Sequence, residues 1–248
     1  MKTIEVTMIA LDAALYAALG YLFYFILPIT TPGLGLVRFW PQVVVPAVFA
    51  AAFGPIVGGA GAGIGIFLSD MLIHGNALLS LMAGVPSNVV MFAIIGYLSF
   101  KRINWKIPLI IFGFISAVLV WIAFGVLSPP AYGFEYQLLA LSVIVGAYIV
   151  LAVFVLLTRW KSFALGSMLG LLAGSSIIAA MVPLFSEFFI LPGSSAVTPL
   201  GITGGLIYLV WTFATEIPFL LVLGPPILRA LYKAFPSLGK HGENREQQ

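Results

Sequence analysis

This 248-residue chain has no cysteine, and only 8% of its residues are charged. The absence of cysteine excludes disulfides, thiol catalysis and thiolate metal sites. The shortage of charge, together with 62% hydrophobic residues and a mean hydropathy of +1.15, leaves no room for a separate water-soluble catalytic domain. The net charge of +3 reflects loop ends that meet anionic lipid headgroups, so it does not indicate a nucleic-acid partner.

Motifs for catalysis and nucleotide binding are also missing. The glycine-rich run at 54–65 has no following Lys-Ser or Lys-Thr, so it is not a phosphate-binding loop. The sequence has no paired Asp-rich motif, no His cluster and no Gly-Xaa-Ser-Xaa-Gly elbow. We therefore expect that the chain is not an enzyme and that it carries no cofactor or metal of its own.

The chain instead consists of long apolar segments. A helix needs about 20 apolar residues to cross the hydrocarbon core of a bilayer. The segments predict an all-α, polytopic transmembrane bundle of about eight helices, or of six or seven if the short segment that contains Pro41 and Pro46 is re-entrant. We expect one transmembrane domain over residues 1–235 and a short polar cytoplasmic tail over 236–248. The expected helices are 8–28, 39–53, 55–73, 83–100, 107–127, 136–158, 162–186 and 203–232.

Basic residues mark the two membrane faces. Ten of the eleven Lys and Arg residues lie on alternate breaks between apolar segments, and only Arg38 lies on one of the other breaks. The positive-inside rule places the basic breaks and both chain termini in the cytoplasm. We therefore expect a multi-pass protein of the plasma membrane whose Arg38 segment faces outward. The ten cytoplasmic cations are Lys2, Lys101, Arg102, Lys106, Arg159, Lys161, Arg229, Lys233, Lys240 and Arg245.

Small residues recur at helical spacing in three of the expected helices. In the first, Ala10, Ala14 and Ala18 form a flat strip that lets another helix approach closely. The run at 54–65 and the Gly166, Gly170, Gly174 repeat of the seventh helix indicate packing inside the bundle instead.

Several of these segments together resemble a known family. The strip Ala-Leu-Asp-Ala-Ala-Leu-Tyr-Ala-Ala at 10–18 is followed by Arg-Phe-Trp-Pro at 38–41, by Ala-Ala-Phe-Gly-Pro-Ile-Val-Gly-Gly at 51–59 and by Leu-Ser-Asp at 68–70. With Ala-Gly-Val-Pro at 83–86, they resemble the substrate-binding S component of an energy-coupling factor (ECF) transporter over about the first hundred residues.

The resemblance implies both a function and a set of partners. It implies a small membrane protein that captures a water-soluble vitamin or related micronutrient at its outer face. Such a protein docks, through the alanine strip of its first helix, on a transmembrane coupling subunit driven by two ATPases that use ATP. Family members commonly have six helices, so the helix correspondence after about residue 100 stays open. Nickel and cobalt members share an amino-terminal His where this chain has Lys2, which argues against a metal substrate.

Arg38, Trp40 and Gln42 are the first candidate substrate-binding residues. They follow the Thr-Thr-Pro-Gly-Leu-Gly segment at 30–35, which could act as the hinge of a lid over a pocket. A cation beside an aromatic residue is also an ordinary anchor at a membrane interface. Both interpretations stay open, although in the resembling family this loop closes over the ligand.

Asp70 and His74 lie four residues apart near the outer end of the third helix, where they could face the same side. They could form part of a ligand site or cap the helix end in the headgroup region. Two ligands at this spacing do not predict a metal site.

The remaining candidates border outer breaks: Asn88 at the start of the fourth helix, Tyr132 and Glu135 between the fifth and sixth, and Glu187 at the end of the seventh. Aromatic residues beside a few polar groups suit a small-molecule pocket, and they are equally common at any membrane interface. Because acids outnumber cations at the outer breaks, the ligand is expected to be neutral or cationic.

Two acids fall deeper in the membrane. Glu216 lies midway along the last helix, two residues before Pro218. A carboxylate at this depth beside a helix break favours a competing hypothesis, a proton-coupled secondary transporter of a small solute. Asp12 lies beside the alanine strip, where we expect it to take part in partner docking or in a helix-end hydrogen bond.

Overall fold

The computed structural model describes residues 2–31, 34–126, 146, 151, 160–193 and 199–236. Within these residues, six helices are long and apolar enough to cross a membrane. The chain is therefore a multi-pass, all-α membrane protein, as its apolar segments predicted. The six helices span Thr3–Ile26, Pro55–Ile73, Ala77–Ser99, Lys106–Gly125, Lys161–Ser186 and Gly201–Ala234.

The other two expected helices differ from these six. The segment expected at 39–53 forms an apolar helix over Pro41–Phe53, which is too short to be a span. The helix expected at 136–158 lies outside the described residues, apart from 146 and 151.

The elements of the described residues are α1 (Thr3–Ile26), β1 (Thr30–Thr31), β2 (Gly35–Arg38), the 3-10 helix η1 (Pro41–Val43), α2 (Val44–Phe53), α3 (Pro55–Ile73), α4 (Ala77–Leu79), the π-helix η2 (Ser80–Gly84), α5 (Val85–Ser99), α6 (Lys106–Trp121), the π-helix η3 (Ile122–Val126), α8 (Lys161–Ser186) and α9 (Gly201–Ala234).

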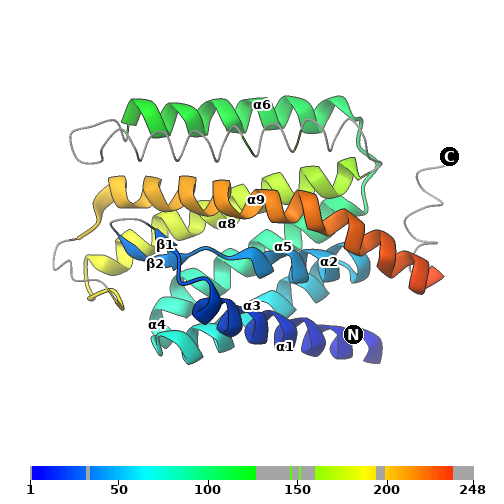
Figure 1. Ribbon diagram of the computed structural model, residues 1–248, viewed down its shortest axis with the longest axis horizontal. Helices are drawn as coiled ribbons and strands as arrows, with labels where there is room; N and C mark the ends of the chain where they lie inside the picture. The colour runs from blue at the N-terminus through cyan, green and yellow to red at the C-terminus, as the bar shows by residue number, and fades with distance from the viewer. Residues whose placement is uncertain are drawn as a thin grey trace.

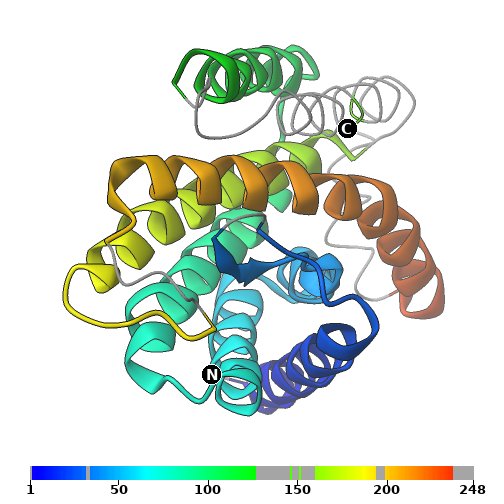
Figure 2. The same cartoon turned by 60° about the vertical axis from the view of Figure 1, so that its left-hand side comes forward.

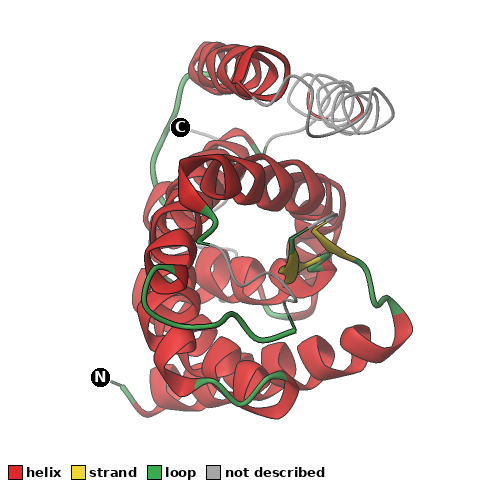
Figure 3. Ribbon diagram, turned by 90° about the vertical axis from the view of Figure 1, so that its left-hand side faces the viewer, coloured by secondary structure: helices red, strands yellow, loops and turns green. Residues whose placement is uncertain are grey.

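The helices form a curved wall around α2. Along this wall α1 packs on α3, α3 on α5, α5 on α8 and α8 on α9, while α2 contacts α3, α5 and α9 from inside (Figure 2). Viewed from one end, the wall makes a ring, and the β1–β2 hairpin lies at its mouth (Figure 3). Helix α6 lies outside the ring, next to α8 (Figure 1). The hairpin is thus positioned to cover one end of the bundle.

Glycine permits the closest helix contacts of this wall. On α3, a Cβ added at Gly65 would lie 2.9 Å from the backbone oxygen of Ala13 on α1. On α8, a Cβ at Gly170 would lie 2.5 Å from the backbone oxygen of Met91 on α5, and Gly166 and Gly174 meet the same helix one turn away on either side. The prediction that these glycines serve packing inside the bundle is therefore confirmed.

A tight turn joins α2 to α3. Gly54 is the one residue between the two helices, and its φ of 106° lies in the left-handed region that favours glycine. Pro55 begins α3, where the missing amide hydrogen removes no helical bond. A Gly-Pro pair therefore suits this short connection.

The connection between α3 and α4 is shorter than expected. The sequence placed an outer break at 73–82 and a helix start at 83, but the helix begins at Ala77. The Asn76 side chain accepts a 3.0 Å hydrogen bond from the Leu79 amide and so caps this earlier start. Asn88 was expected at the start of a helix, but it lies well inside the continuous span Ala77–Ser99.

The first outer loop and the last helix also take a definite form. Residues expected as a flexible loop form a two-stranded antiparallel hairpin, in which Thr30 pairs with Arg38 and Thr31 with Gly35. Helix α9 continues through Pro218 and two further prolines as a single helix of 34 residues, and it changes direction along its length (Figure 2). Prolines inside a helix account for such a bend.

The two ends of the bundle differ in charge. Lys2 precedes α1, Lys101 follows α5, Lys161 begins α8 and Lys233 lies in the last turn of α9. These positions share one end of the bundle, on the right in Figure 1. The β1–β2 hairpin and α4 lie at the opposite end.

Candidate ligand-binding site

A cavity of about 110 Å³ lies beneath the β1–β2 hairpin. All five helices of the wall contribute residues to this cavity, and so does the hairpin. The cavity therefore forms only when distant parts of the chain come together. Its lining consists of Tyr16, Leu36, Val37, Arg38, Trp40, Ile66, Asp70, His74, Leu79, Ala83, Gly84, Asn88, Met91, Ile178, Val182 and Glu216.

The π-helix η2 shapes the floor of the cavity. Its first residue, Ser80, donates a 2.7 Å hydrogen bond to Oδ2 of Asp70 on α3. Its last residue, Gly84, lies so close to the same carboxylate that an added Cβ would be 2.7 Å from Oδ2. Short π segments inside helices are frequent at functional sites because they shift side chains out of the regular helical register. Here the shift brings Ser80 to Asp70.

Asp70 also holds His74. The distance between His74 Nε2 and Asp70 Oδ1 is 3.4 Å, and the His74 Nδ1 atom accepts a 3.1 Å hydrogen bond from the Asn76 amide. Because Nδ1 is an acceptor, the proton of a neutral His74 ring is on Nε2, toward Asp70. Asp70 therefore has a partner for each of its two oxygens.

A chain of hydrogen bonds ties the hairpin to the helices. The indole nitrogen of Trp40, which lies just after β2, donates to the Tyr16 hydroxyl at 2.9 Å. That hydroxyl donates to Oδ1 of Asn88 at 2.7 Å, and the Asn88 amide nitrogen donates to the Gly84 backbone oxygen at 2.9 Å. All three side chains are buried, so these bonds fix the position of the hairpin relative to α1 and α5.

Arg38 enters the cavity from the hairpin. Its guanidinium carbon lies 5.4 Å from the centre of the Tyr24 ring and 5.3 Å from the Trp40 ring, within the range of cation–π attraction. Its side chain makes no hydrogen bond or ion pair within the part of the chain that the structure describes. Burial lowers the pKa of Arg38, and the nearby Asp70 carboxylate acts in the opposite direction. An arginine nevertheless stays protonated, so the cavity contains a cation.

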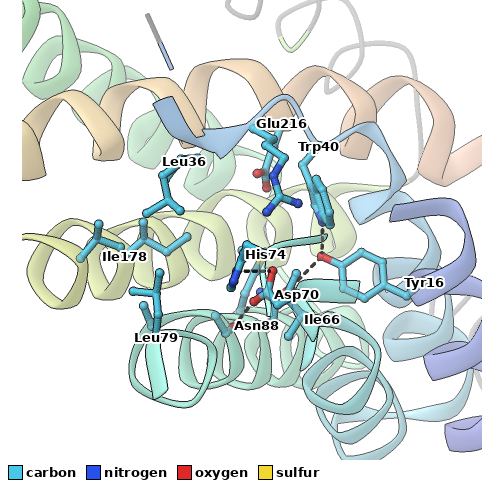
Figure 4. A pocket seen from close by; sticks show the side chains of 16 residues that line it. Tyr16, Leu36, Trp40, Ile66, Asp70, His74, Leu79, Asn88, Ile178 and Glu216 are labelled. Carbon is cyan, nitrogen blue, oxygen red and sulfur yellow. Dashed lines mark hydrogen bonds and ion pairs between the residues drawn. The ribbon is translucent and has the colours of Figure 1, made fainter. Parts of the chain in front are cut away.

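Glu216 reaches the cavity from α9, above Asp70 and His74 in the view of Figure 4. The residue is 5% exposed, and its Oε2 atom has no hydrogen-bond partner among the described residues. The sequence singled out this carboxylate for its depth in the membrane. It did not predict that the side chain would share a cavity with Arg38 and Asp70.

Apolar side chains form one side of the cavity and hold the hairpin down. Figure 4 shows Leu36, Leu79 and Ile178 on one side, with Tyr16 and Trp40 opposite. Leu36 belongs to a hydrophobic cluster that includes Leu79 and Val182, and its φ of 54° is unusual for a residue other than glycine. The hairpin is therefore closed over the cavity by apolar contact.

The predicted substrate-binding residues fall into three groups. Arg38, Trp40, Asp70, His74 and Asn88 come together around the cavity. Gln42 is buried in η1 outside the cavity lining, and Glu187 is exposed just beyond α8. Tyr132 and Glu135 lie outside the described residues.

Sequence reasoning missed Tyr16, Ser80 and Gly84 as parts of the site. Ser80, Gly84 and Asn88 recur every four residues, which places small or polar groups on one face of a helix. This spacing was a usable signal. The apolar residues Ile178 and Val182 carried none, because nothing distinguishes them from other apolar residues of a membrane helix.

A second surface lies on α1, away from the cavity. Ala10, Ala14 and Ala18 are exposed, whereas Ala13 and Ala17 are buried on the side that packs on α3. Asp12 is fully buried, and neither of its oxygens has a hydrogen-bond partner in the described part of the chain. The expectations for Asp12 were therefore wrong: its neighbour is Gly61 of α3, so it is neither on the exposed strip nor in a helix-end hydrogen bond.

No protein-family model matches this chain, and no curated protein or solved structure is similar enough to it to count as a match. Its function must therefore be inferred from the cavity and the surfaces themselves.

Proposed function

We propose that this protein is the substrate-specificity subunit, or S component, of an ECF-type importer in the plasma membrane. In this role it binds a small water-soluble vitamin or related micronutrient at its outer face and then docks on a transmembrane coupling subunit driven by two ATPases. The observation that carries the proposal is the cavity of about 110 Å³ beneath the hairpin, where Arg38, Asp70 and Glu216 converge beside apolar side chains. Concave sites that combine an apolar wall with a few polar groups are typical of small-molecule binding.

The distribution of charge supports the proposed orientation. By the positive-inside rule, the end of the bundle that carries Lys2, Lys101, Lys161 and Lys233 faces the cytoplasm. The hairpin and the cavity then face outward, where they meet incoming solute. In this orientation the hairpin that carries Arg38 is the lid of the binding site.

The exposed alanine strip supports the proposed docking step. Ala10, Ala14 and Ala18 remain on the surface of α1 after its packing with α3 is complete. Small residues let a second helix approach closely, which is how membrane helices associate without a hydrophobic driving force. The chain has no nucleotide motif, so in this function the energy for uptake comes from ATP bound by the partner subunits.

Co-purification from native membranes tests the proposal. The full chain, solubilised in mild detergent, is expected to retain a transmembrane coupling subunit and two ATPase subunits. Purification of the chain alone, under conditions in which a known three-subunit membrane complex stays intact, would contradict the proposed function.

The competing function is proton-coupled secondary transport. It is favoured by Glu216, whose buried carboxylate lines the cavity and whose Oε2 atom has no hydrogen-bond partner within the described ranges. Reconstitution of the purified chain into liposomes discriminates between the two functions. A secondary transporter takes up solute when only a proton gradient is applied, and it loses uptake in the variant Glu216→Gln. An S component alone catalyses no such uptake.

A further inference from the structure

We propose that the cavity binds a small amphoteric molecule, which offers a carboxylate or similar acceptor group to Arg38 and a protonated amine or N–H group to Glu216. This inference rests on the proposed function, since it names the substrate class of the same site. It also narrows the expectation of a neutral or cationic ligand to a molecule that carries groups of both kinds.

Most other polar groups of the cavity are already paired within the protein. Asp70 accepts from Ser80 and lies against His74. Tyr16 both donates and accepts a hydrogen bond, and Asn88 uses its oxygen and its nitrogen in bonds to neighbouring residues. These groups shape the cavity, but a ligand would have to break existing bonds to use them.

Arg38 and Glu216 are different because both have unused capacity. The Arg38 guanidinium has five N–H donors and lies over two aromatic rings, without a hydrogen bond or ion pair to another described residue. Glu216 is buried, and its Oε2 atom makes no hydrogen bond to any residue that the structure describes. The two groups come from opposite ends of the chain, and both line the cavity.

Electrostatics then selects the ligand. A buried polar group without a partner is costly, and a buried ion costs more. A purely anionic ligand would satisfy Arg38 and leave Glu216 unpaired beside a like charge, and a purely cationic ligand would do the reverse. A ligand with both groups satisfies both at once and needs no net charge.

The rest of the cavity limits the size and the body of the ligand. Leu36, Leu79, Ile178 and Val182 provide an apolar wall opposite Tyr16 and Trp40. The volume of about 110 Å³ is smaller than the engineered apolar cavity of about 150 Å³ that binds benzene. The body that fits is a short branched chain or a single small ring.

Two matched sets of probes test the inference on the purified full-length chain. The first set is leucine, isocaproate and isoamylamine, and the second is para-aminomethylbenzoate, para-toluate and para-methylbenzylamine. Within each set the body is constant, whereas the first compound carries both charges and the other two carry one each. Binding is measured by calorimetry and by the shift in thermal unfolding. In at least one set, the compound with both charges is expected to bind about tenfold or more tightly than either analogue, since a charge-assisted hydrogen bond is lost with each group.

Two variants assign the contributions. In Arg38→Gln, the carboxylate should no longer add affinity, so the analogue with only the amine should bind as well as the compound with both charges. In Glu216→Gln, the amine should no longer add affinity, so the analogue with only the carboxylate should bind as well as the compound with both charges. Arg102→Gln and Glu187→Gln, which alter exposed residues outside the cavity, serve as controls and should leave the order of affinities unchanged.

The inference would be overturned if neither compound with both charges bound better than its analogues. Weak or absent binding of both compounds counts as this outcome. That outcome is separate from the proposed function. Co-purification with a coupling subunit and ATPases would still support an S component, one that takes a different class of ligand.

Discussion

The Tyr16 hydroxyl donates a 2.7 Å hydrogen bond to Oδ1 of Asn88, 72 residues away in the sequence. This bond joins α1 to α5 inside the bundle, and the same hydroxyl accepts the indole N–H of Trp40 at the end of the hairpin. One phenol oxygen thus connects two transmembrane helices to the segment that covers the cavity.

The variant Tyr16→Phe should therefore lower stability. It leaves the Asn88 oxygen and the Trp40 N–H without a partner in a buried site, which costs about 1 to 3 kcal/mol. The midpoint of thermal unfolding in detergent measures the loss. Tyr21→Phe, on an exposed position of the same helix, is the matched control and should leave the midpoint unchanged. Equal midpoints for the two variants would show that the Tyr16 hydroxyl contributes nothing.

Helix packing at glycine gives a second prediction. In Gly170→Ala, the new Cβ would lie 2.5 Å from the Met91 oxygen and 2.9 Å from Cγ1 of Ile95, so α5 and α8 must move apart. Overpacking of this kind costs about 1 to 3 kcal/mol. In Gly113→Ala on α6, the new Cβ would meet no described residue within 4 Å, so the variant should be neutral or stabilising, because alanine is the better helix former. Chemical or thermal unfolding of both variants checks the contrast, and a loss of stability in Gly113→Ala alone would contradict it.

The sequence predicted the spans better than the site. Each span depends on about 20 consecutive apolar residues, a local property that can be read without knowing the fold. The tight turn at Gly54-Pro55 was also predictable, since the two residues favour that backbone conformation by themselves. The start of α4 at Ala77 was missed because its cap, Asn76, is followed by an irregular π segment instead of a regular apolar period.

The cavity depends on contacts that no local pattern encodes. Trp40 and Asp70 were candidates because charged residues are rare in this chain, and Trp40 lies two residues after the charged Arg38. Their proximity to Glu216 arises only from the tertiary fold, because Glu216 belongs to α9, which is distant in the sequence from Trp40 and Asp70. The same limit applies to Asp12, which faces α3 and not the exposed strip because of where Gly61 leaves room.

The hairpin should depend on Leu36 for closure. Leu36→Ser removes part of the apolar contact with Leu79 and Val182, which is worth about 1 kcal/mol for a half-buried leucine. Opening of the hairpin should then be about fivefold more frequent, and the hydrogen exchange of amides in β2 correspondingly faster. Ile29→Ser, an exposed residue before β1, is the control. Unchanged exchange in Leu36→Ser would mean that two hydrogen bonds hold the hairpin without help from this cluster. In these bonds the Thr31 hydroxyl donates to the Val37 backbone oxygen at 2.8 Å, and the Trp40 indole donates to Tyr16.

Asp12 should behave unlike Asp70. Because neither Asp12 oxygen has a hydrogen-bond partner in the portion of the chain that the structure describes, Asp12→Ala removes an unsatisfied buried group and should leave stability unchanged or raise it by up to about 2 kcal/mol. Asp70→Ala removes the acceptor of the buried Ser80 hydroxyl and should lower stability. Thermal unfolding of the two variants side by side compares them. A loss in Asp12→Ala as large as that in Asp70→Ala would reveal a partner for Asp12.

Docking and ligand binding should separate in variants of α1. Ala14→Leu adds bulk to the exposed strip without touching α3, so it should abolish recovery of the coupling subunit and uptake in cells. Thermal stability of the isolated chain should stay unchanged, because position 14 is exposed in the chain on its own. Ala180→Leu, at an exposed position of α8, is the matched control and should retain assembly and uptake. Ala13→Leu, by contrast, should destabilise the chain, because Ala13 is buried at the contact between α1 and α3.

If Ala14→Leu assembled normally while ligand binding was lost, the strip would belong to the binding function, and the separation between the cavity and the docking surface would be wrong. If Ala14→Leu and Ala180→Leu lost assembly equally, the effect would come from added bulk anywhere on the lipid-facing surface. Only a selective loss of assembly at position 14 follows from helix-to-helix docking, because close approach requires small residues along one strip and tolerates large ones elsewhere.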